Sequence, residues 1–224
     1  MRAVLFDLDE TLFDRTGSLK LFLADQHARH EMLQAWMQPV YVDRFLQLDR
    51  RGMVAKAIVY SALLEEIGDC DPAFAAALLR EYEQKLGRFA RSFAGAHEVL
   101  ADLRSRQLRL GIVTNGRTSM QTSKIADLDL QDRVDTILIS EAEGVRKPNA
   151  EIFLRAAANL DVQPDACLFV GDNPLADILG ARAVGMRTVW FPNGAGWPDD
   201  CADAPGDTIK SLTELIAIVE SSPA

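Results

Sequence analysis

Two aspartates at the end of the first predicted strand have the types and spacing to do chemistry. An apolar run begins at Ala3, shows no alternation of polar and apolar residues, and leads into Asp7 and, two residues later, Asp9. Such a run predicts a strand buried on both faces, as in the middle of a parallel sheet. Side chains two apart on a strand point the same way, so we expect both carboxylates at one spot beyond its carboxyl end. Like charges repel there, so either a cation is bound or one acid keeps its proton.

Further polar residues follow the later predicted strands or begin a helix. They are, in chain order, Thr114, Asn115, Gly116, Lys147, Asp172 and Asp177. Thr114 offers a hydroxyl, and the backbone N–H groups of the next two residues can face an anion. Lys147 stands just before a helix, so its charge and the N-terminus of that helix point the same way. Together these residues supply carboxylates, an ammonium group and a hydroxyl to the loops at one edge of a sheet.

These groups favour phosphoryl transfer assisted by a metal ion. Oxygen ligands without histidine or cysteine favour a hard cation, Mg²⁺ above all. Mg²⁺ beside an ammonium group and a hydroxyl forms a receptor for phosphate. An aspartate can attack phosphorus and form an aspartyl phosphate, while a second carboxylate protonates the leaving oxygen and later deprotonates water. Phosphoryl transfer needs little more than positioning and charge neutralisation.

The elements that must position these groups alternate between strands and helices. Predicted strands lie at residues 3–8, 108–113, 136–140, 167–170 and 187–191, and helices are predicted at residues 96–106, up to residue 160, after residue 174 and after residue 211. This order predicts an α/β fold with a Rossmann-like, three-layer parallel sheet. Ligands of such sheets bind at the carboxyl ends of the strands, near the point where the strand order reverses.

Residues 18–92 break the alternation, because their pattern is helical throughout. The first helix is predicted from about Ser18 to Met37, and a later one has Asp71 as its N-cap and Pro72 at its first position. We therefore expect residues 15–92 to form an inserted four-helix cap subdomain. Residues 1–14 and 93–224 would form the catalytic core.

Composition narrows the partners and the compartment. The net charge of −9 argues against binding to nucleic acid, which needs a basic face. No apolar run is long enough to span a membrane, and we expect no signal peptide because the chain enters a strand almost at once. Cys70, Cys167 and Cys201 are odd in number and far apart, which indicates a reducing, cytoplasmic location. A small phosphomonoester is the expected partner, without nucleic acid or membrane.

Four ordered motifs resemble those of the haloacid dehalogenase-like (HAD) hydrolases. They are DLDETLFD at residues 7–14, VTNG at 113–116, KP at 147–148 and GDNPLAD at 171–177. The resemblance covers the whole chain. It implies that Asp7 is the nucleophile and Asp9 the general acid and base, and that Thr114 and Lys147 hold the phosphoryl group.

The same resemblance implies the metal ligands and the role of the insertion. Asp172 would bind Mg²⁺ together with Asp7 and the backbone carbonyl of Asp9, while Asp177 would brace the outer shell of the metal. The insertion resembles a helical cap that carries substrate specificity. Arg50 and Arg51, a basic turn between two of its helices, would contact an anionic or polar group of the substrate, although a solvated turn explains them equally well.

Other functions remain open beside a phosphatase of small metabolites such as sugar phosphates, nucleoside monophosphates or phosphoglycolate-like acids. A phosphomutase shares every core motif and differs only in the cap. A dehalogenase displaces halide from carbon and has no use for an acid at Asp9. A non-catalytic sensor of phosphorylated metabolites would usually have lost one of the core acids, and all of them are present.

Overall fold

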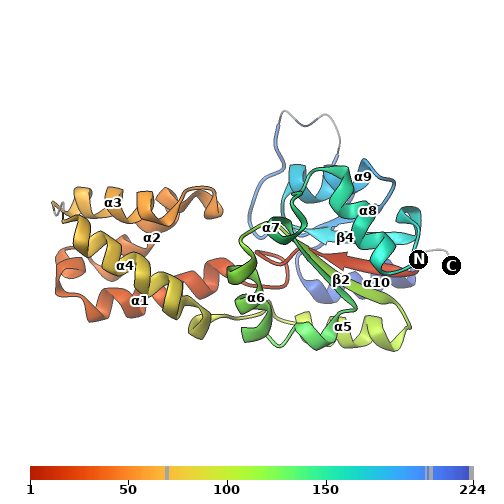
Figure 1. The fold of residues 1–224 in the computed structure, drawn as a ribbon, viewed down its shortest axis with the longest axis horizontal. Coiled ribbons are helices and arrows are strands. Elements are labelled where there is room, and N and C mark those ends of the chain that lie inside the picture. Colours follow the sequence, from red (N-terminus) through yellow and green to blue (C-terminus); the bar gives the residue numbers. More distant parts are fainter. Residues whose placement is uncertain (69–70, 200, 202–203, 222–224) are drawn as a thin grey trace. The chain divides into compact units, whose positions relative to one another are not determined.

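The chain forms two compact units, which are described separately. The computed structural model describes residues 1–68, 71–199, 201 and 204–221, so Cys70 lies outside the described residues. One unit, the core unit, comprises Met1–Asp14 and Ser92–Ala224, and the other, the helical unit, comprises Arg15–Arg91. Figure 1 shows the elements of both units, coloured by their position in the sequence.

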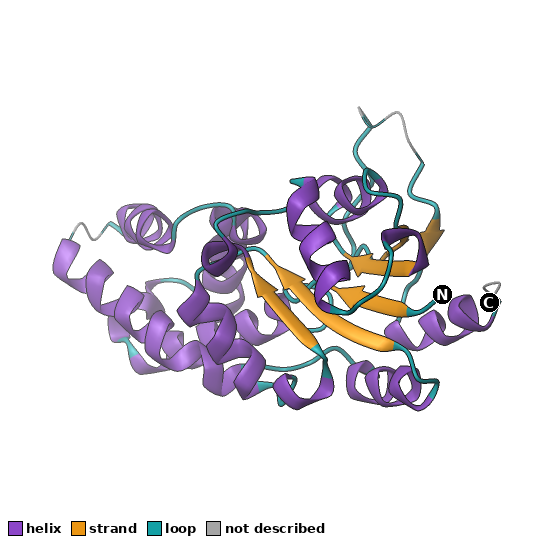
Figure 2. Ribbon diagram, turned by 45° about the vertical axis from the view of Figure 1, so that its right-hand side comes forward, coloured by secondary structure: helices purple, strands orange, loops and turns teal. Residues whose placement is uncertain are grey.

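The core unit is built on one parallel sheet (Figure 2). Its strands are β1 (Ala3–Phe6), β2 (Arg109–Thr114), β3 (Thr136–Ile139), β4 (Cys167–Gly171), β5 (Arg187–Trp190) and β6 (Asp207–Thr208). Their order in the sheet is β3-β2-β1-β4-β5-β6, and every pair is parallel. The predicted α/β fold with a parallel sheet is therefore confirmed. The short, exposed β6 was not predicted, because two residues carry no periodic pattern.

Strand β1 lies at the centre of this sheet, and all four of its residues are buried. It pairs with β2 on one side and β4 on the other, so the chain winds outward from β1 in both directions. The strand order reverses beside β1. The residues that follow β1 and β4 therefore lie where a doubly wound sheet forms its ligand site.

Helices cover both faces of the sheet. Helices α5 (Ala96–Ser105) and α10 (Leu215–Glu220) lie on one face, and α8 (Ala150–Asn159) and α9 (Gly180–Arg182) on the other, as Figure 1 shows. Right-handed crossovers place the helices in this way. Beneath α8, the rings of Phe153 and Phe169 meet edge to face with centroids 5.1 Å apart, within an apolar cluster that also holds Leu5 and Val113. This core fixes the strand ends that carry the polar residues.

The helical unit contains α1 (Arg15–Arg29), α2 (Gln38–Asp49), α3 (Lys56–Ile67) and α4 (Pro72–Lys85). Asp71 caps α4 as predicted, since its side chain accepts a hydrogen bond from the backbone of Ala73 at 2.9 Å. The prediction of one helix up to Met37 is wrong. Helix α1 ends at Arg29 because His30 is extended and contacts Glu81 at 3.0 Å, a tertiary contact that the helical pattern does not reveal.

The chain leaves and re-enters the core unit along two adjacent segments. Phe13 and Ser92 form an antiparallel bridge, and the N–H of Phe93 donates to the carbonyl of Leu12 at 3.0 Å. Arg15 already begins α1, so Phe13 and the first residue of this helix are separated by Asp14 alone.

Among the described residues, no helix is both long enough and apolar enough to cross a membrane. The thiols of Cys167 and Cys201 are unpaired.

Candidate active site

Lys147 connects two buried carboxylates at the carboxyl edge of the sheet. Its ammonium group lies 2.6 Å from Oδ1 of Asp7 and 2.6 Å from Oδ1 of Asp177. The three side chains are at most 9% exposed. Asp7 directly follows β1, Asp177 lies in the π-helical turn after β4, and Lys147 precedes α8. The structure thus brings together three predicted site residues from distant parts of the sequence.

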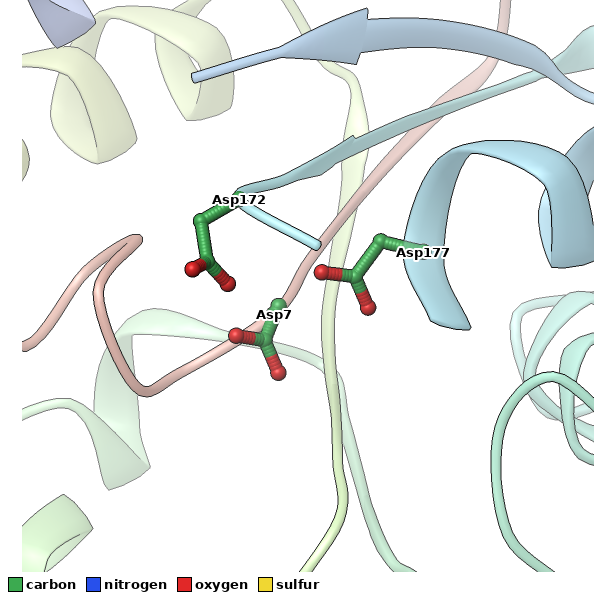
Figure 3. A group of neighbouring side chains, drawn as sticks. All are labelled: Asp7, Asp172 and Asp177. Atoms are coloured by element: carbon green, nitrogen blue, oxygen red, sulfur yellow. The ribbon is translucent and has the colours of Figure 1, made fainter. Parts of the chain in front are cut away.

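Asp172 completes a group of carboxylates with Asp7 and Asp177. One carboxylate oxygen of each lies within 4.8 Å of the others, and Figure 3 shows the three side chains converging from the ends of β1 and β4 and from the turn that follows β4. Lys147 supplies one positive charge to these three acids. Oxygen ligands gathered in this way, with an excess of negative charge, fit a hard divalent cation. The residues present therefore suit a divalent metal ion.

Burial and neighbouring charges shift the pKa values of both Asp7 and Lys147. Burial raises the pKa of Asp7 well above its usual value, and the charges of Asp177 and Asp172 raise it further against the opposing effect of Lys147. Burial lowers the pKa of Lys147, but the charges of Asp177 and Asp7 outweigh it and raise that pKa overall. Lys147 is thus a permanent cation. A bound metal ion would add positive charge beside Asp7 and so favour its ionised form.

The loop after β4 explains the spacing between Asp172 and Asp177. Gly171 ends β4, and a Cβ atom there would lie 2.5 Å from the side chain of Asp177, so only glycine allows this approach. The side chain of Asn173 accepts hydrogen bonds from two N–H groups of the following turn, and the backbone N–H of Asn173 donates to Oδ2 of Asp177 at 2.9 Å. Asp177 is thereby fixed with both oxygens engaged.

The loop that follows β2 is hydrogen-bonded to the backbone of Lys147. The side chain of Asn115 donates to the carbonyl of Lys147 at 3.0 Å and accepts from its N–H at 2.9 Å. The N–H of Gly116, expected to face an anion, instead donates to the hydroxyl of Ser140 at 3.0 Å. Thr114 is buried at the strand end. The amide of Asn115 thus positions the lysine through its backbone.

Asp9 does not join the carboxylate group as its spacing from Asp7 suggested. Strand β1 ends at Phe6, and the carbonyl of Leu8 accepts hydrogen bonds from the N–H groups of Leu12 and Phe13 at 3.0 and 2.8 Å. The chain turns at this point, so the alternation of a strand no longer applies at Asp9. Among the described residues, the group within metal-binding distance comprises Asp7, Asp172 and Asp177 without the side chain of Asp9.

Two residues that the sequence reasoning missed contact Asp9 instead. The ammonium group of Lys124 lies 2.7 and 2.9 Å from its two carboxylate oxygens, and Gln121 donates to Oδ2 at 2.8 Å. Both lie on α6 (Thr118–Asp127), a helix that was not predicted because its sequence has no clear apolar stripe. The available signal was the spacing of two long polar residues three apart, which puts them on one helix face.

Arg50 and Arg51 belong to the helical unit, in a tight turn between α2 and α3. Both are exposed and have positive φ angles of 46° and 56°. The buried carboxylate of Asp49 holds the turn, since it accepts from the N–H of Gly52 at 2.8 Å and pairs with Arg15 at 2.7 Å. The turn therefore has a defined conformation.

Comparisons with known proteins show the family of the chain. The family model of the haloacid dehalogenase-like hydrolases matches residues 1–185. A glyceraldehyde 3-phosphate phosphatase of Pyrococcus furiosus is 32% identical, over 98% of this chain and 93% of its own. A phosphoserine phosphatase of Thermus thermophilus is 29% identical, over 96% of this chain and 99% of this chain's counterpart is not implied, since the match covers 98% of its own.

The solved structures include a similar protein with a bound metal ion. The HAD hydrolase YfnB of Bacillus subtilis, solved with magnesium, is 28% identical with a TM-score of 0.74, over 97% of this chain and 98% of its own. Phosphatases related over nearly the full length support a phosphoric monoester hydrolase. The chain belongs to the haloacid dehalogenase-like hydrolases, in their phosphatase branch.

Proposed function

We propose that the protein is a Mg²⁺-dependent phosphatase of small phosphorylated metabolites that works through an aspartyl phosphate on Asp7. The observation that carries this proposal is the position of Lys147, which lies 2.6 Å from both Asp7 and Asp177 beside Asp172. An ammonium group among carboxylates at the switch point of the sheet suits a phosphoryl group, whose charge must be neutralised.

In the first half-reaction, a carboxylate oxygen of Asp7 attacks phosphorus as the bond to the leaving oxygen breaks. Lys147 and the hydroxyl of Thr114 contact the phosphoryl oxygens and neutralise or orient them. Asp9 donates a proton to the leaving oxygen, so the product departs as an alcohol. The two acids thus have different tasks, which fits their different surroundings: Asp7 is buried against Lys147, and Asp9 is partly exposed against Lys124.

In the second half-reaction, Asp9 accepts a proton from a water molecule that attacks the phosphorus of the aspartyl phosphate. The bond between phosphorus and Asp7 breaks, which releases inorganic phosphate and restores the carboxylate. A bound Mg²⁺, held by Asp7, Asp172 and the backbone carbonyl of Asp9, would supply charge neutralisation for both steps. Asp177 would act beyond these ligands by holding Lys147.

We propose sugar phosphates as the first substrate class to examine. Several relatives at about this level of similarity are named glyceraldehyde 3-phosphate phosphatases, and another is named a ribulose-1,5-bisphosphate 5-phosphatase. Arg50 and Arg51 would contact a polar or anionic group of such a substrate. The support for this contact is that the turn carrying both arginines has a defined conformation, which the buried carboxylate of Asp49 holds.

We also propose that the enzyme is cytoplasmic and has no nucleic-acid or membrane partner. The net charge of −9 disfavours contact with a phosphate backbone. The unpaired thiols of Cys167 and Cys201 suit a reducing compartment.

A screen of phosphorylated metabolites for release of inorganic phosphate, with Mg²⁺ and with excess chelator, tests the function. We expect release from small sugar phosphates with Mg²⁺ and none with chelator. Conversion of a substrate into an isomeric phosphate ester without phosphate release would indicate a phosphomutase. Binding without turnover of any ester, including 4-nitrophenyl phosphate, would contradict enzymatic function.

A further inference from the structure

Two residues of α6 connect Asp9 to Thr114. Gln121 and Lys124 are three residues apart and therefore lie on the same face of the helix. The amide nitrogen of Gln121 donates to Oδ2 of Asp9 at 2.8 Å and to the hydroxyl oxygen of Thr114 at 2.6 Å. Lys124 donates to both carboxylate oxygens of Asp9 and, at 2.7 Å, to the amide oxygen of Gln121.

The orientation of the Gln121 amide follows from its neighbours. Its oxygen faces the ammonium group of Lys124, which can only donate, and its nitrogen faces a carboxylate, which accepts. Both N–H bonds of the amide are thereby used. Because the oxygen of Thr114 accepts one of them, the hydrogen of its own hydroxyl points elsewhere and is available to an anion. Gln121 is only 2% exposed, so water does not compete strongly for these bonds.

Lys124 fixes the plane of the Asp9 carboxylate through two hydrogen bonds, at 2.7 and 2.9 Å. Its ammonium group also lies 5.4 Å from the ring centroid of Phe13, which is buried and bridged to the backbone of Asp9. The loop from Asp9 to Phe13 is therefore tied to α6 at both ends. Glycine at position 116 permits this arrangement, since a Cβ there would lie 2.9 Å from the side chain of Gln121.

We propose that Gln121 and Lys124 are positioning residues of the phosphatase site: Lys124 holds the carboxylate of Asp9, and Gln121 sets the hydroxyl of Thr114 as a donor to the phosphoryl group. The inference rests on the proposed function, which assigns proton transfer to Asp9 and phosphoryl binding to Thr114. A group that transfers a proton must be within hydrogen-bond reach of the reacting oxygen, and a small misplacement is costly. Asp9 follows a strand end and a turn, so the backbone of β1 alone does not place its carboxylate.

A double-mutant cycle on the Mg²⁺-loaded enzyme tests the role of Lys124. The proteins compared are wild type, Lys124→Met, Asp9→Asn and the double variant, assayed with 4-nitrophenyl phosphate and with a sugar phosphate. Lys124→Met should lower kcat about 10- to 100-fold, while KM and the inhibition constant of inorganic phosphate change less than about threefold. In the Asp9→Asn background, Lys124→Met should lower kcat by less than about threefold further, because no carboxylate remains to be positioned.

Gln121→Met should give a different result, because it acts through the phosphoryl-binding hydroxyl as well. We expect inhibition by inorganic phosphate to weaken about 10-fold, and kcat to fall. Lys124→Arg should keep more activity than Lys124→Met, since a guanidinium group can also bond both oxygens of a carboxylate. Lys210→Met is the matched control: it removes a positive charge from an exposed lysine of the core unit and should leave kcat unchanged.

The outcomes separate this inference from the proposed function. A wild-type kcat in Lys124→Met, or losses in the double variant that multiply as independent effects, would overturn the role of Lys124. Unchanged kcat and phosphate inhibition in Gln121→Met would overturn that of Gln121. If Lys124→Met lowers Tm and reduces kcat by the same factor in the wild-type and Asp9→Asn backgrounds, its contact is merely structural. If wild type releases phosphate from no ester, the proposed function itself fails.

Discussion

The ammonium group of Lys147 lies 2.6 Å from Oδ1 of Asp7, although 140 residues separate them in the sequence. Both side chains are almost completely buried, and the same ammonium group contacts Asp177. The pair connects the first strand of the sheet to the start of α8. It places a permanent cation against the proposed nucleophile, at the edge of the proposed phosphoryl site.

Replacing this lysine should destabilise the fold as well as stop the reaction. Lys147→Met leaves the carboxylates of Asp7 and Asp177 buried without their cation, and breaking a buried ion pair in this way costs about 3–5 kcal/mol. Urea denaturation in the presence of chelator measures the change in the free energy of unfolding. Stability equal to wild type would show that the pair contributes nothing to the fold. Lys20→Met, on an exposed position of α1, is the control and should change stability by less than about 0.5 kcal/mol.

Metal binding should be visible without catalysis. Mg²⁺ added to the metal-free protein should raise Tm, because the ion binds the folded carboxylates and relieves their mutual repulsion. Asp172→Ala should reduce this shift and activity together. Chelator should abolish phosphate release, and Ca²⁺ should inhibit it, since its larger and more flexible shell tolerates a different arrangement of carboxylate oxygens. Full activity in excess chelator would refute the metal requirement.

Asp9→Asn should slow turnover by about 10²–10⁴-fold, because an amide can neither protonate the leaving oxygen nor accept a proton from water. The loss should be smaller with 4-nitrophenyl phosphate, whose leaving group needs little help. Steady-state kinetics with aryl and sugar phosphates measure this difference. Asp161→Asn, at an exposed position with a φ of 54° that asparagine tolerates, is the matched control. Equal, small losses in both variants would remove Asp9 from the mechanism.

Gly171→Ala should displace Asp177 and with it Lys147. The added Cβ would lie 2.5 Å from the Asp177 side chain, and overpacking of this kind costs about 1–3 kcal/mol. We expect a lower Tm and at least a partial loss of activity. Gly196→Ala is the control, since nothing lies within 4 Å of a Cβ there. Identical behaviour of the two variants would show that the fit of Gly171 against Asp177 is unimportant.

The sequence predicted the meeting of Asp7, Lys147 and Asp177 because the carboxyl ends of parallel strands share one edge of a sheet, whatever the details of packing. It could not predict the contacts of Asp9. They depend on where β1 stops and on α6, which has no apolar stripe and faces Asp9 with the polar side chains of Gln121 and Lys124.

The break after Arg29 was hidden for a similar reason. The apolar pattern continues past it, and the contact between His30 and Glu81 joins residues 51 apart in the sequence. Periodicity reports which face of a segment is buried, but it does not report which polar groups meet across elements.

The most direct test of the central claim is to detect the phosphoryl group on Asp7. The Asp9→Asn enzyme, in which hydrolysis of the intermediate is slowed, is mixed with 4-nitrophenyl phosphate and Mg²⁺, quenched in acid and digested for peptide mass spectrometry. The account predicts a phosphoryl group on the peptide that contains Asp7, and its absence in an Asp7→Asn variant treated in the same way. Phosphate release without any phosphorylated Asp7, at a rate that Asp7→Asn leaves unchanged, would contradict it.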